Sequence, residues 1–592
     1  MIRDRIKKAI QKASGEVEIE LVKPEFAEQG DYATNIALKM GGRKVAEELA
    51  VKLKSDKDLV AIVSKIEVAG PGFINFWVDP IMLVKNIEQI SDRSKKYRIS
   101  GTGEGKTVLV EYSAPNIAKR FGIGHLRSTI IGDSLYRLHK ALGYTVVGEN
   151  HLGDWGTQFG VFLYKICEEN KGIDLAKVTI DDLEKMYVDF NTEAENNKEI
   201  WEKAKEWFKK LESGDIQARK VWKKIRDISL LEFGKIYDLL GVKIDNAHGE
   251  SFYEDKVAEV IDELQGKGIS KKSEGALIVE FDAMPPAMAL KSDGTTTYFT
   301  RDLAAIRYRL DKWNPDIFIY EVGSEQKLHF KQVFEAAKKL GWTKNKEFVH
   351  VAHGLFRFKD GKMSTRKGKT VRLEDVLDQA IYRATSLSDD SSKRADDPYF
   401  KPRTKKANST KHLKSLEEAG DVGKKVGIGS IKYFDLLHSP TSDIVFDWNK
   451  IFLLEGNSAP YLQYTYARCR SILEKYGKKV STNLEQFDMN KDEELVARAL
   501  IHFEETVESA ATNYSPNLLC NYLFTLAQSY NTFYSHNKIV NSGQTTEGGM
   551  AGNKESKLTK EVEELRVALS LATAEVLSNG LDLLGIQAPE RM

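Results

Sequence analysis

The alternation of apolar and polar residues changes along the chain and divides it into segments of different secondary structure. Residues 107–111 form a short apolar, β-rich run that is typical of a strand buried in a parallel sheet. Apolar residues then recur at helical spacing from Leu126 to Leu142, Gly143 ends this helix, and a second strand begins at Tyr144. A strand, a helix and a strand in this order predict a βαβ unit and a doubly wound, Rossmann-type parallel sheet.

The segments on either side of this unit follow other patterns. Residues 1–100 combine helical stretches with short strands and end in a Gly/Ser-rich linker, and a charged helical insertion near 175–240 interrupts the sheet pattern. Strands are expected at 62–68, 73–78, 276–281, 317–320 and 349–351. Helices are expected at 457–476, 493–511, 516–533 and 558–584.

These patterns predict a multidomain α/β protein. Its expected parts are a small α+β N-terminal domain at 1–100, a Rossmann-type domain at 101–383, a polar basic insert at 384–420 and an all-α domain at 421–592. The insert is rich in Lys and Arg and has almost no aliphatic side chains. A solvated flexible linker explains such a composition, and a basic loop that contacts nucleic acid is the alternative.

Composition narrows the set of partners. Lys and Arg total 88 against 87 Asp and Glu, so any affinity for nucleic acid must be regional. Cys167, Cys469 and Cys520 are too scattered for a disulfide framework or a Cys-based zinc site. No apolar run approaches the roughly 18 residues that a membrane span needs, and the charged start lacks a signal-peptide core. We therefore expect a cytoplasmic monomer with no zinc and no membrane partner.

The loop that follows the strand at 107–111 carries the first candidate chemistry. It contains Gly122 and Gly124, and a glycine lets a ligand ring or phosphate lie against the backbone where a Cβ would block it. The start of the next helix offers N–H groups to an anion, and His125 stands there, able to hydrogen-bond phosphate oxygens. An ordinary structural turn is the alternative for this short Gly-x-Gly-His pattern taken alone.

A second segment carries several cations. Lys362, Arg366 and Lys367 lie close together between two glycines, with Met363 and Ser364 among them. Such a loop can neutralise the charge that develops as pyrophosphate leaves a triphosphate. An exposed basic turn is the alternative, but the presence of both segments in one chain favours a nucleotide site.

Together the two segments resemble the nucleotide-handling signatures of class I aminoacyl-tRNA synthetases, and their surroundings resemble the arginyl-tRNA synthetases. The resemblance extends over residues 30–35, 70–75, 111–160, 457–464 and 584–586. Two positions depart from the class signatures. Gly122 stands where the first motif begins with histidine, and Thr365 stands where the second has a lysine, so Arg366 or Lys367 would supply that charge.

The resemblance implies an arginine–tRNA ligase that uses ATP, with Mg²⁺ carried on the nucleotide, and that takes L-arginine and tRNA(Arg) as partners. It implies catalytic roles for His125, Lys362 and Arg366. The ATP-binding residues that it implies are Gly122, Gly124, His125, Lys362, Met363, Ser364 and Lys367.

A site for arginine needs a carboxylate and further acceptors, because the guanidinium is planar, charged and rich in donors. An apolar stripe at 297–310 places Tyr298 and Asp302 together on a neighbouring face of a predicted helix, where surface hydrogen bonding is the alternative role. The resemblance implies that the arginine-binding residues are Glu111, Asn116, Tyr298, Asp302 and Gln326. Glu325 is an alternative to Gln326.

The C-terminal helices carry tyrosines and arginines in a pattern that suits stacking on RNA bases, with core packing as the alternative. By resemblance this region is an anticodon-binding domain, with Tyr461, Tyr464 and Arg468 as tRNA-binding candidates. Asn75 and Phe76 are the candidates in the N-terminal domain, which by the same resemblance would contact the outer corner of the tRNA.

Two other functions stay open on the sequence. A small-molecule nucleotidyltransferase can share the Gly-x-Gly-His element, although it would have no use for the long C-terminal helical region. A catalytically silent tRNA-binding paralogue is the other, and the replacements at Gly122 and Thr365 are the features that favour it.

Overall fold

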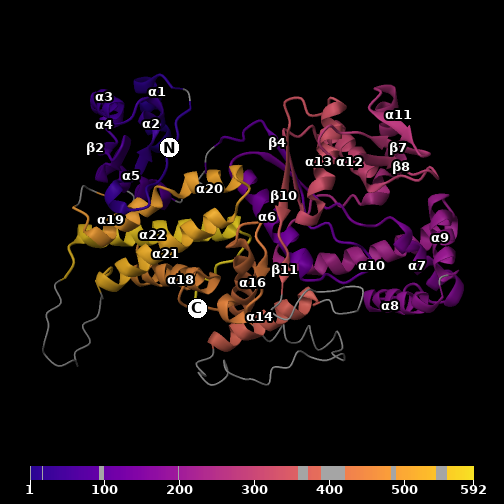
Figure 1. The fold of residues 1–592 in the computed structure, drawn as a ribbon. Coiled ribbons are helices and arrows are strands. Elements are labelled where there is room, and N and C mark those ends of the chain that lie inside the picture. Colours follow the sequence, from indigo (N-terminus) through magenta and orange to yellow (C-terminus); the bar gives the residue numbers. More distant parts are fainter. Residues whose placement is uncertain are drawn as a thin grey trace.

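A parallel sheet lies at the centre of the molecule, with the N-terminal unit and most C-terminal helices on one side and a helical insertion on the other (Figure 1). The computed structural model describes residues 2–16, 18–92, 99, 101–197, 199–357, 371–388, 420–481, 484, 488–541 and 557–592. Among these residues, no helix combines the length and the apolarity that crossing a membrane requires.

The central sheet has the strand order β10-β9-β4-β5, and its four strands are parallel. The strands are β4 (Thr107–Glu111), β5 (Thr145–Glu149), β9 (Ile317–Gly323) and β10 (Glu347–His353). Helix α6 (Gly124–Ala141) connects β4 with β5, as the apolar spacing predicts. From β4 the chain continues to β5 at one edge of the sheet, and from β9 it continues to β10 at the other edge. The strand order therefore reverses between β4 and β9, and the carboxyl ends of these two strands are the expected ligand site.

The N-terminal unit is built on an antiparallel sheet of order β1-β3-β2. Its elements are α1 (Ile2–Ser14), η1 (Ala27–Gln29), β1 (Tyr32–Thr34), α2 (Ile36–Met40), α3 (Arg43–Lys54), α4 (Lys57–Val60), β2 (Val63–Ala69), β3 (Phe73–Val78) and α5 (Pro80–Ser91). Asp31 accepts a hydrogen bond from the Val78 N–H at 2.7 Å and pairs with Arg498 of the C-terminal helices. The motif around Asp31 therefore docks the N-terminal unit onto the rest of the molecule.

The insertion predicted near 175–240 is helical. After α7 (Thr157–Tyr164) and the π-helical turn η2 (Lys165–Glu169), it consists of α8 (Ile180–Asn196), α9 (Glu199–Glu212) and α10 (Ile216–Leu240). The strand expected at 276–281 does not join the parallel sheet, because it pairs with its sequence neighbours in a separate antiparallel sheet. This region contains η3 (Glu250–Lys256), α11 (Val257–Gly266), β6 (Ser270–Ser273), β7 (Ala276–Val279), β8 (Ala287–Leu290), α12 (Tyr298–Trp313), η4 (Ser324–Gln326) and α13 (Lys327–Lys339).

The last part of the chain is almost entirely helical. Its elements are β11 (Phe356–Arg357), α14 (Leu373–Ser388), α16 (Asp421–Leu436), β12 (Ile444–Val445), α17 (Trp448–Ile451), α18 (Ala459–Tyr476), α19 (Lys491–Leu500), α20 (Phe503–Thr512), α21 (Asn517–His536) and α22 (Lys560–Leu583). Most of the predicted insert at 384–420 lies outside the described residues. The predicted α/β fold class is confirmed by this arrangement.

The prediction of a single helix at 493–511 is wrong. The structure divides it into α19 and α20, with a break at Ile501 and His502. His502 is buried there, and its ring packs edge-on against Tyr32 of the N-terminal unit at 5.1 Å. This contact between distant parts of the chain accompanies the break, and the local apolar spacing carries no information about it.

Candidate active site

The loop between β4 and α6 has an unusual backbone. Ser113, Ala114 and Ala118 have φ values of 74°, 43° and 63°, in the left-handed region that residues other than glycine seldom adopt. The conformation is held by two hydrogen bonds: the Ser113 N–H donates to Ser128 Oγ at 3.0 Å, and the Ala114 N–H donates to Asn150 Oδ1 at 3.1 Å. Backbone strain that neighbouring contacts enforce is typical of ligand-binding loops.

The turn that begins α6 leaves room for a ligand. A Cβ added at Gly124 would meet no atom within 4 Å. His125 Nδ1 accepts a hydrogen bond from the Gly122 N–H at 3.3 Å, so the neutral imidazole carries its proton on Nε2. Burial lowers the pKa of His125 to about 4, which keeps the ring neutral at pH 7. The turn thus presents an N–H donor beside the positive end of a helix.

The second predicted signature lies outside the described residues, and with it Lys362, Met363, Ser364, Thr365, Arg366 and Lys367. The chain that follows it contacts the glycine turn directly. Arg372 forms an antiparallel bridge with Gly122, and the Ile123 N–H donates to the Val371 carbonyl at 3.1 Å. The first signature and the residues after the second therefore share backbone hydrogen bonds.

Asp302, on the first turns of α12, is the carboxylate most clearly prepared for a cation. His329 Nε2 lies 2.5 Å from one of its oxygens, and His151 Nε2 lies 3.6 Å from the other. Burial opposes ionisation of Asp302, but the hydrogen bond and charge of His329 outweigh it and lower the pKa of Asp302. Burial likewise opposes protonation of His329, but Asp302 raises the pKa of that ring.

Three further predicted arginine-binding residues, Tyr298, Asn116 and Gln326, are exposed. Tyr298 is 59% exposed at the start of α12, and the Arg301 guanidinium lies 4.8 Å from the centre of its ring. Asn116 pairs through its backbone with Gly153, where an added Cβ would lie 2.0 Å from the Asn116 side-chain oxygen. Gln326 ends the short turn that follows β9. These side chains come from the ends of neighbouring strands and from the helix that carries Asp302.

Glu111 ends β4 and is buried. Its carboxylate lies 2.5 Å from Arg309 Nη1, and the Arg309 side chain has no exposed area. Burial raises the pKa of Tyr253 and of Tyr320, and the charge of Arg309 and its contact with both hydroxyls oppose that rise. The charge of Arg309 also lowers the pKa of Asp302, so we call Glu111, Arg309 and the two tyrosines the floor of the candidate site.

Sequence reasoning did not single out His151, His329 or Arg309 as site residues. Signals for each were present: His151 lies in the 111–160 stretch, His329 follows Gln326 closely, and Arg309 lies two helical turns after Asp302. Pairing between histidine and carboxylate across different elements is a tertiary property, which explains why the local pattern did not reveal it.

The tRNA-binding candidates fall into two groups. Arg468 lies between two rings, 4.9 Å from the centre of Tyr464 and 4.5 Å from that of Tyr534, and Tyr464 is 47% exposed. Tyr461 is half-buried and packs on Phe524 at 5.6 Å. The first of these contacts is a stack of two aromatic rings around a cation, in which Tyr464 is exposed and Arg468 and Tyr534 are partly buried.

Asn75 and Phe76 form the second group and lie on β3. Phe76 has no exposed area and Asn75 is 6% exposed, because β3 is the middle strand of its sheet. As placed, neither side chain presents a surface to RNA. This corrects the expectation that they contact tRNA, and they are dropped as candidates.

Comparisons with known proteins decide the family. The model of the class I (R) tRNA synthetase catalytic domain matches residues 86–448, the DALR anticodon binding domain matches 462–592, and the arginyl tRNA synthetase N-terminal domain matches 1–78. An arginine–tRNA ligase of Clostridium botulinum (strain Alaska E43) is 38% identical over 96% of this chain and 95% of its own length. The chain belongs to the arginyl-tRNA synthetases.

Membership in this family makes the chain an arginine–tRNA ligase of class I, which uses ATP, arginine and tRNA. A ligase of Halothermothrix orenii is also 38% identical over 96% of this chain. Among solved structures, the arginyl-tRNA synthetases of Plasmodium falciparum and Thermus thermophilus each superpose with a TM-score of 0.79 over 100% of the chain, at 24% and 22% identity. The superpositions include 98% of the first of these two chains and 100% of the second, and they show that this chain shares their fold.

Proposed function

We propose that arginine is activated at the carboxyl edge of the parallel sheet, beside β4 and β9. The observation that carries the proposal is the state of Asp302 on α12. His329 and, more weakly, His151 favour the ionised form of its carboxyl group. Asp302 receives the substrate guanidinium, with Tyr298, Asn116 and Gln326 around it. Glu111 contacts the substrate from the floor, where Arg309 holds its carboxylate.

ATP lies against the glycine turn. Gly122 and Gly124 admit the nucleotide, and His125 donates from Nε2 to its phosphates. By family resemblance, Lys362, Arg366 and Lys367, with Met363 and Ser364, complete the phosphate site. The arginine carboxylate attacks the α-phosphate and displaces pyrophosphate, giving arginyl-adenylate. A hydroxyl of the 3′-terminal adenosine of tRNA(Arg) then takes the arginyl group and AMP leaves. Positioning and charge neutralisation carry this chemistry, so that no side chain serves as a covalent nucleophile.

Mg²⁺ enters with the nucleotide and neutralises phosphate charge when bound. The described residues contain no group of three His, Cys, Asp or Glu side chains arranged to hold a metal.

The stack of Tyr464, Arg468 and Tyr534, with Tyr461 on the same helix as the first two, offers the exposed Tyr464 ring and a cation to the splayed bases of an anticodon loop. We assign the tRNA contacts of 421–592 to this surface and the chemistry to 101–383. The domain boundaries predicted from the sequence, a monomeric state and a cytoplasmic location are part of the same proposal.

The test is ATP–pyrophosphate exchange with each of the twenty amino acids, with and without tRNA. Exchange with arginine alone is expected, and dependence on tRNA would show whether activation requires the second substrate. Asp302→Asn should abolish the arginine signal. Absence of exchange with every amino acid, beside intact tRNA binding, would overturn the proposal in favour of a silent paralogue, with Gly122 and Thr365 as the altered positions.

A further inference from the structure

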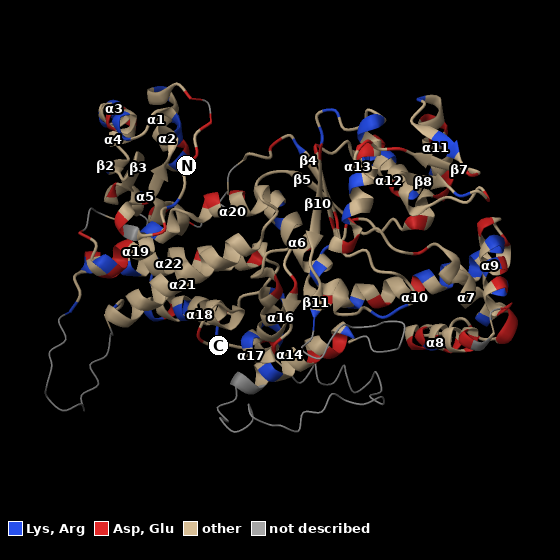
Figure 2. Cartoon of the chain, viewed as in Figure 1, with Lys and Arg blue, Asp and Glu red and all other residues tan. Residues whose placement is uncertain are grey.

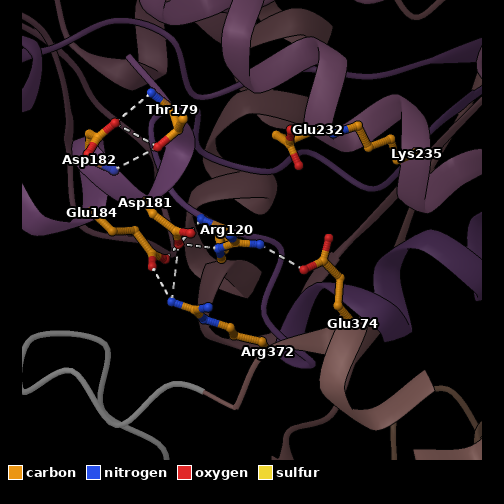
Figure 3. Close-up of polar contacts among 9 residues, drawn as sticks. All are labelled: Arg120, Thr179, Asp181, Asp182, Glu184, Glu232, Lys235, Arg372 and Glu374. Carbon is orange, nitrogen blue, oxygen red and sulfur yellow. Dashed lines mark hydrogen bonds and ion pairs between the residues drawn. The ribbon is translucent and has the colours of Figure 1, made fainter. Parts of the chain in front are cut away.

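A cluster of charged side chains joins three distant parts of the chain beside the glycine turn (Figure 3). We call Arg120, Asp181, Glu184, Arg372 and Glu374 the α8 clamp. Arg120 precedes the glycine turn, Asp181 and Glu184 lie on the first turns of α8, and Arg372 and Glu374 lie at the start of α14.

Arg120 is the centre of the clamp. Its Nε and Nη2 atoms donate to the two oxygens of Asp181 at 2.7 and 2.6 Å, a bidentate pair. Its Nη1 atom donates to Glu374 at 2.7 Å. One guanidinium therefore connects the insertion with α14.

The carboxylates of α8 also reach the second arginine. Arg372 Nη2 lies 3.4 Å from Asp181 and 3.3 Å from Glu184. The other oxygen of Glu184 accepts a hydrogen bond from the Arg120 backbone N–H at 3.0 Å. Each carboxylate thus contacts both the loop before the glycine turn and the chain at Arg372.

The backbone at the clamp is continuous with the ATP site. Besides the bridge between Gly122 and Arg372, the Leu373 N–H donates to the Phe121 carbonyl at 2.9 Å. A displacement of residues 371–373 would therefore move the backbone of 121–123, and with it the start of α6. His125 lies on that first turn.

The sequence of α8 is suited to this contact. Lysines and arginines are interspersed with acidic residues over most of the molecule, whereas α8 is predominantly acidic (Figure 2). A capping box of Thr179 and Asp182 begins the helix, and Asp181 and Glu184 then share one face. The clamp side chains are 17% to 55% exposed, a setting in which ion pairs add little to global stability.

We propose that Asp181 and Glu184 are positioning residues for the binding of ATP in arginine activation. They touch no substrate, and they hold the loop before the glycine turn and the start of α14 in the register that places His125 and the turn on the nucleotide. The proposal rests on the proposed function, since it takes the turn at 122–125 as the ATP site. It assigns to the first helix of the insertion a role in nucleotide binding.

The test compares Asp181→Asn and Glu184→Gln with a matched control, Glu232→Gln. Glu232 pairs with Lys235 at 2.6 Å on α10 and is drawn in the same view, outside the clamp (Figure 3). Arginine-dependent pyrophosphate exchange is measured with ATP varied at saturating arginine, and with arginine varied at saturating ATP. The KM for ATP should rise several-fold, up to about fivefold, in the clamp variants, because each variant loses ion pairs that are partly exposed and modest in energy.

The KM for arginine should stay within about twofold, and Glu232→Gln should match the wild type in both constants. Asp181→Glu, which keeps the carboxylate, should recover most of the affinity for ATP.

An unchanged KM for ATP in both clamp variants would overturn the proposal and leave the cluster as a surface ion-pair network. Equal rises in both KM values, or a fall in thermal midpoint that accounts for the lost activity, would also overturn it. If the wild type itself shows no exchange with arginine, the proposed function fails instead, so the two failures are distinguishable.

Discussion

Arg120 and Arg127 flank the same glycine turn, but their surroundings differ. Arg127, on α6, is 1% exposed and binds Asp435 of α16 at 3.1 Å, together with the carbonyls of Gly354 and Ser442 at 2.9 and 2.6 Å. Arg120 meets its carboxylates near the surface, where Asp181 is 55% exposed. Asp302 and His329, 21% and 24% exposed, lie between these extremes.

The difference separates two uses of charge. A buried pair that loses one partner leaves an uncompensated charge, so Arg127 holds α6, α16 and the segment at Gly354 together. Exposed pairs adjust the geometry of a loop at a small cost in stability if they break. Each of these ionic contacts predicts a different size of effect when it is removed.

The largest effect is expected for Arg127→Gln. Asp435 would remain buried without its cation, and stability should fall by about 3–5 kcal/mol. The measurement is the free energy of unfolding in urea, for the transition in which the α6–α16 contact is lost, with circular dichroism as the signal. Asp435→Asn should give a similar loss. A change below about 1 kcal/mol in both variants would show that the carbonyl contacts of Arg127 hold the interface without the ion pair.

The second effect concerns the substrate. Asp302→Asn removes the carboxylate that we propose receives the substrate guanidinium, and kcat/KM for arginine should fall at least about a hundredfold, the order of two charge-assisted hydrogen bonds. The KM for ATP should change little. Tyr298→Phe keeps the ring and should cost far less. A loss of ATP affinity of equal size would argue against the assignment of Asp302 to the arginine end of the site.

The third effect depends on pH. Because the pKa of His329 is raised, the stability that its charged form contributes is complete below about pH 6.5 and is lost as the pH rises through the raised pKa. Asp302, whose pKa is lowered, contributes above its ordinary pKa and loses that contribution as the pH falls through the lowered value. The charged pair therefore contributes fully between the ordinary pKa of aspartate and that of histidine, at mildly acidic pH.

In the proposed site, the substrate guanidinium and protonated His329 would compete for Asp302. The KM for arginine should consequently decrease several-fold as the pH rises through the raised pKa of His329. His329→Gln should flatten this dependence, and the pH profile of arginine-dependent exchange measures both. A wild-type KM that increases over this range would contradict the competition.

The smallest effect on stability is expected at the α8 clamp. Asp181→Asn should lower the free energy of unfolding by no more than about 1 kcal/mol, because its ion pairs are largely exposed. Differential scanning calorimetry beside Arg127→Gln would test the comparison directly. A loss as large as that of Arg127→Gln would remove the distinction between the two arginines.

Local patterns determined a substantial part of this protein. The strand Thr107–Glu111 and the helix after it appear where apolar spacing predicts them, because a strand buried on both faces and an amphipathic helix have periods that can be read along the chain. The glycine turn and the family resemblance likewise come from contiguous residues, since a motif of this kind is local.

Tertiary structure decided what depends on distant partners. The break between α19 and α20 at His502, the burial of Phe76 in the middle of its sheet and the pairing of Asp302 with His329 all join segments that are separate in sequence. The same holds for Arg120, whose acidic partners belong to an insertion and to α14. Burial and electrostatic pairing depend on distances in space, and the sequence displays only distances along the chain.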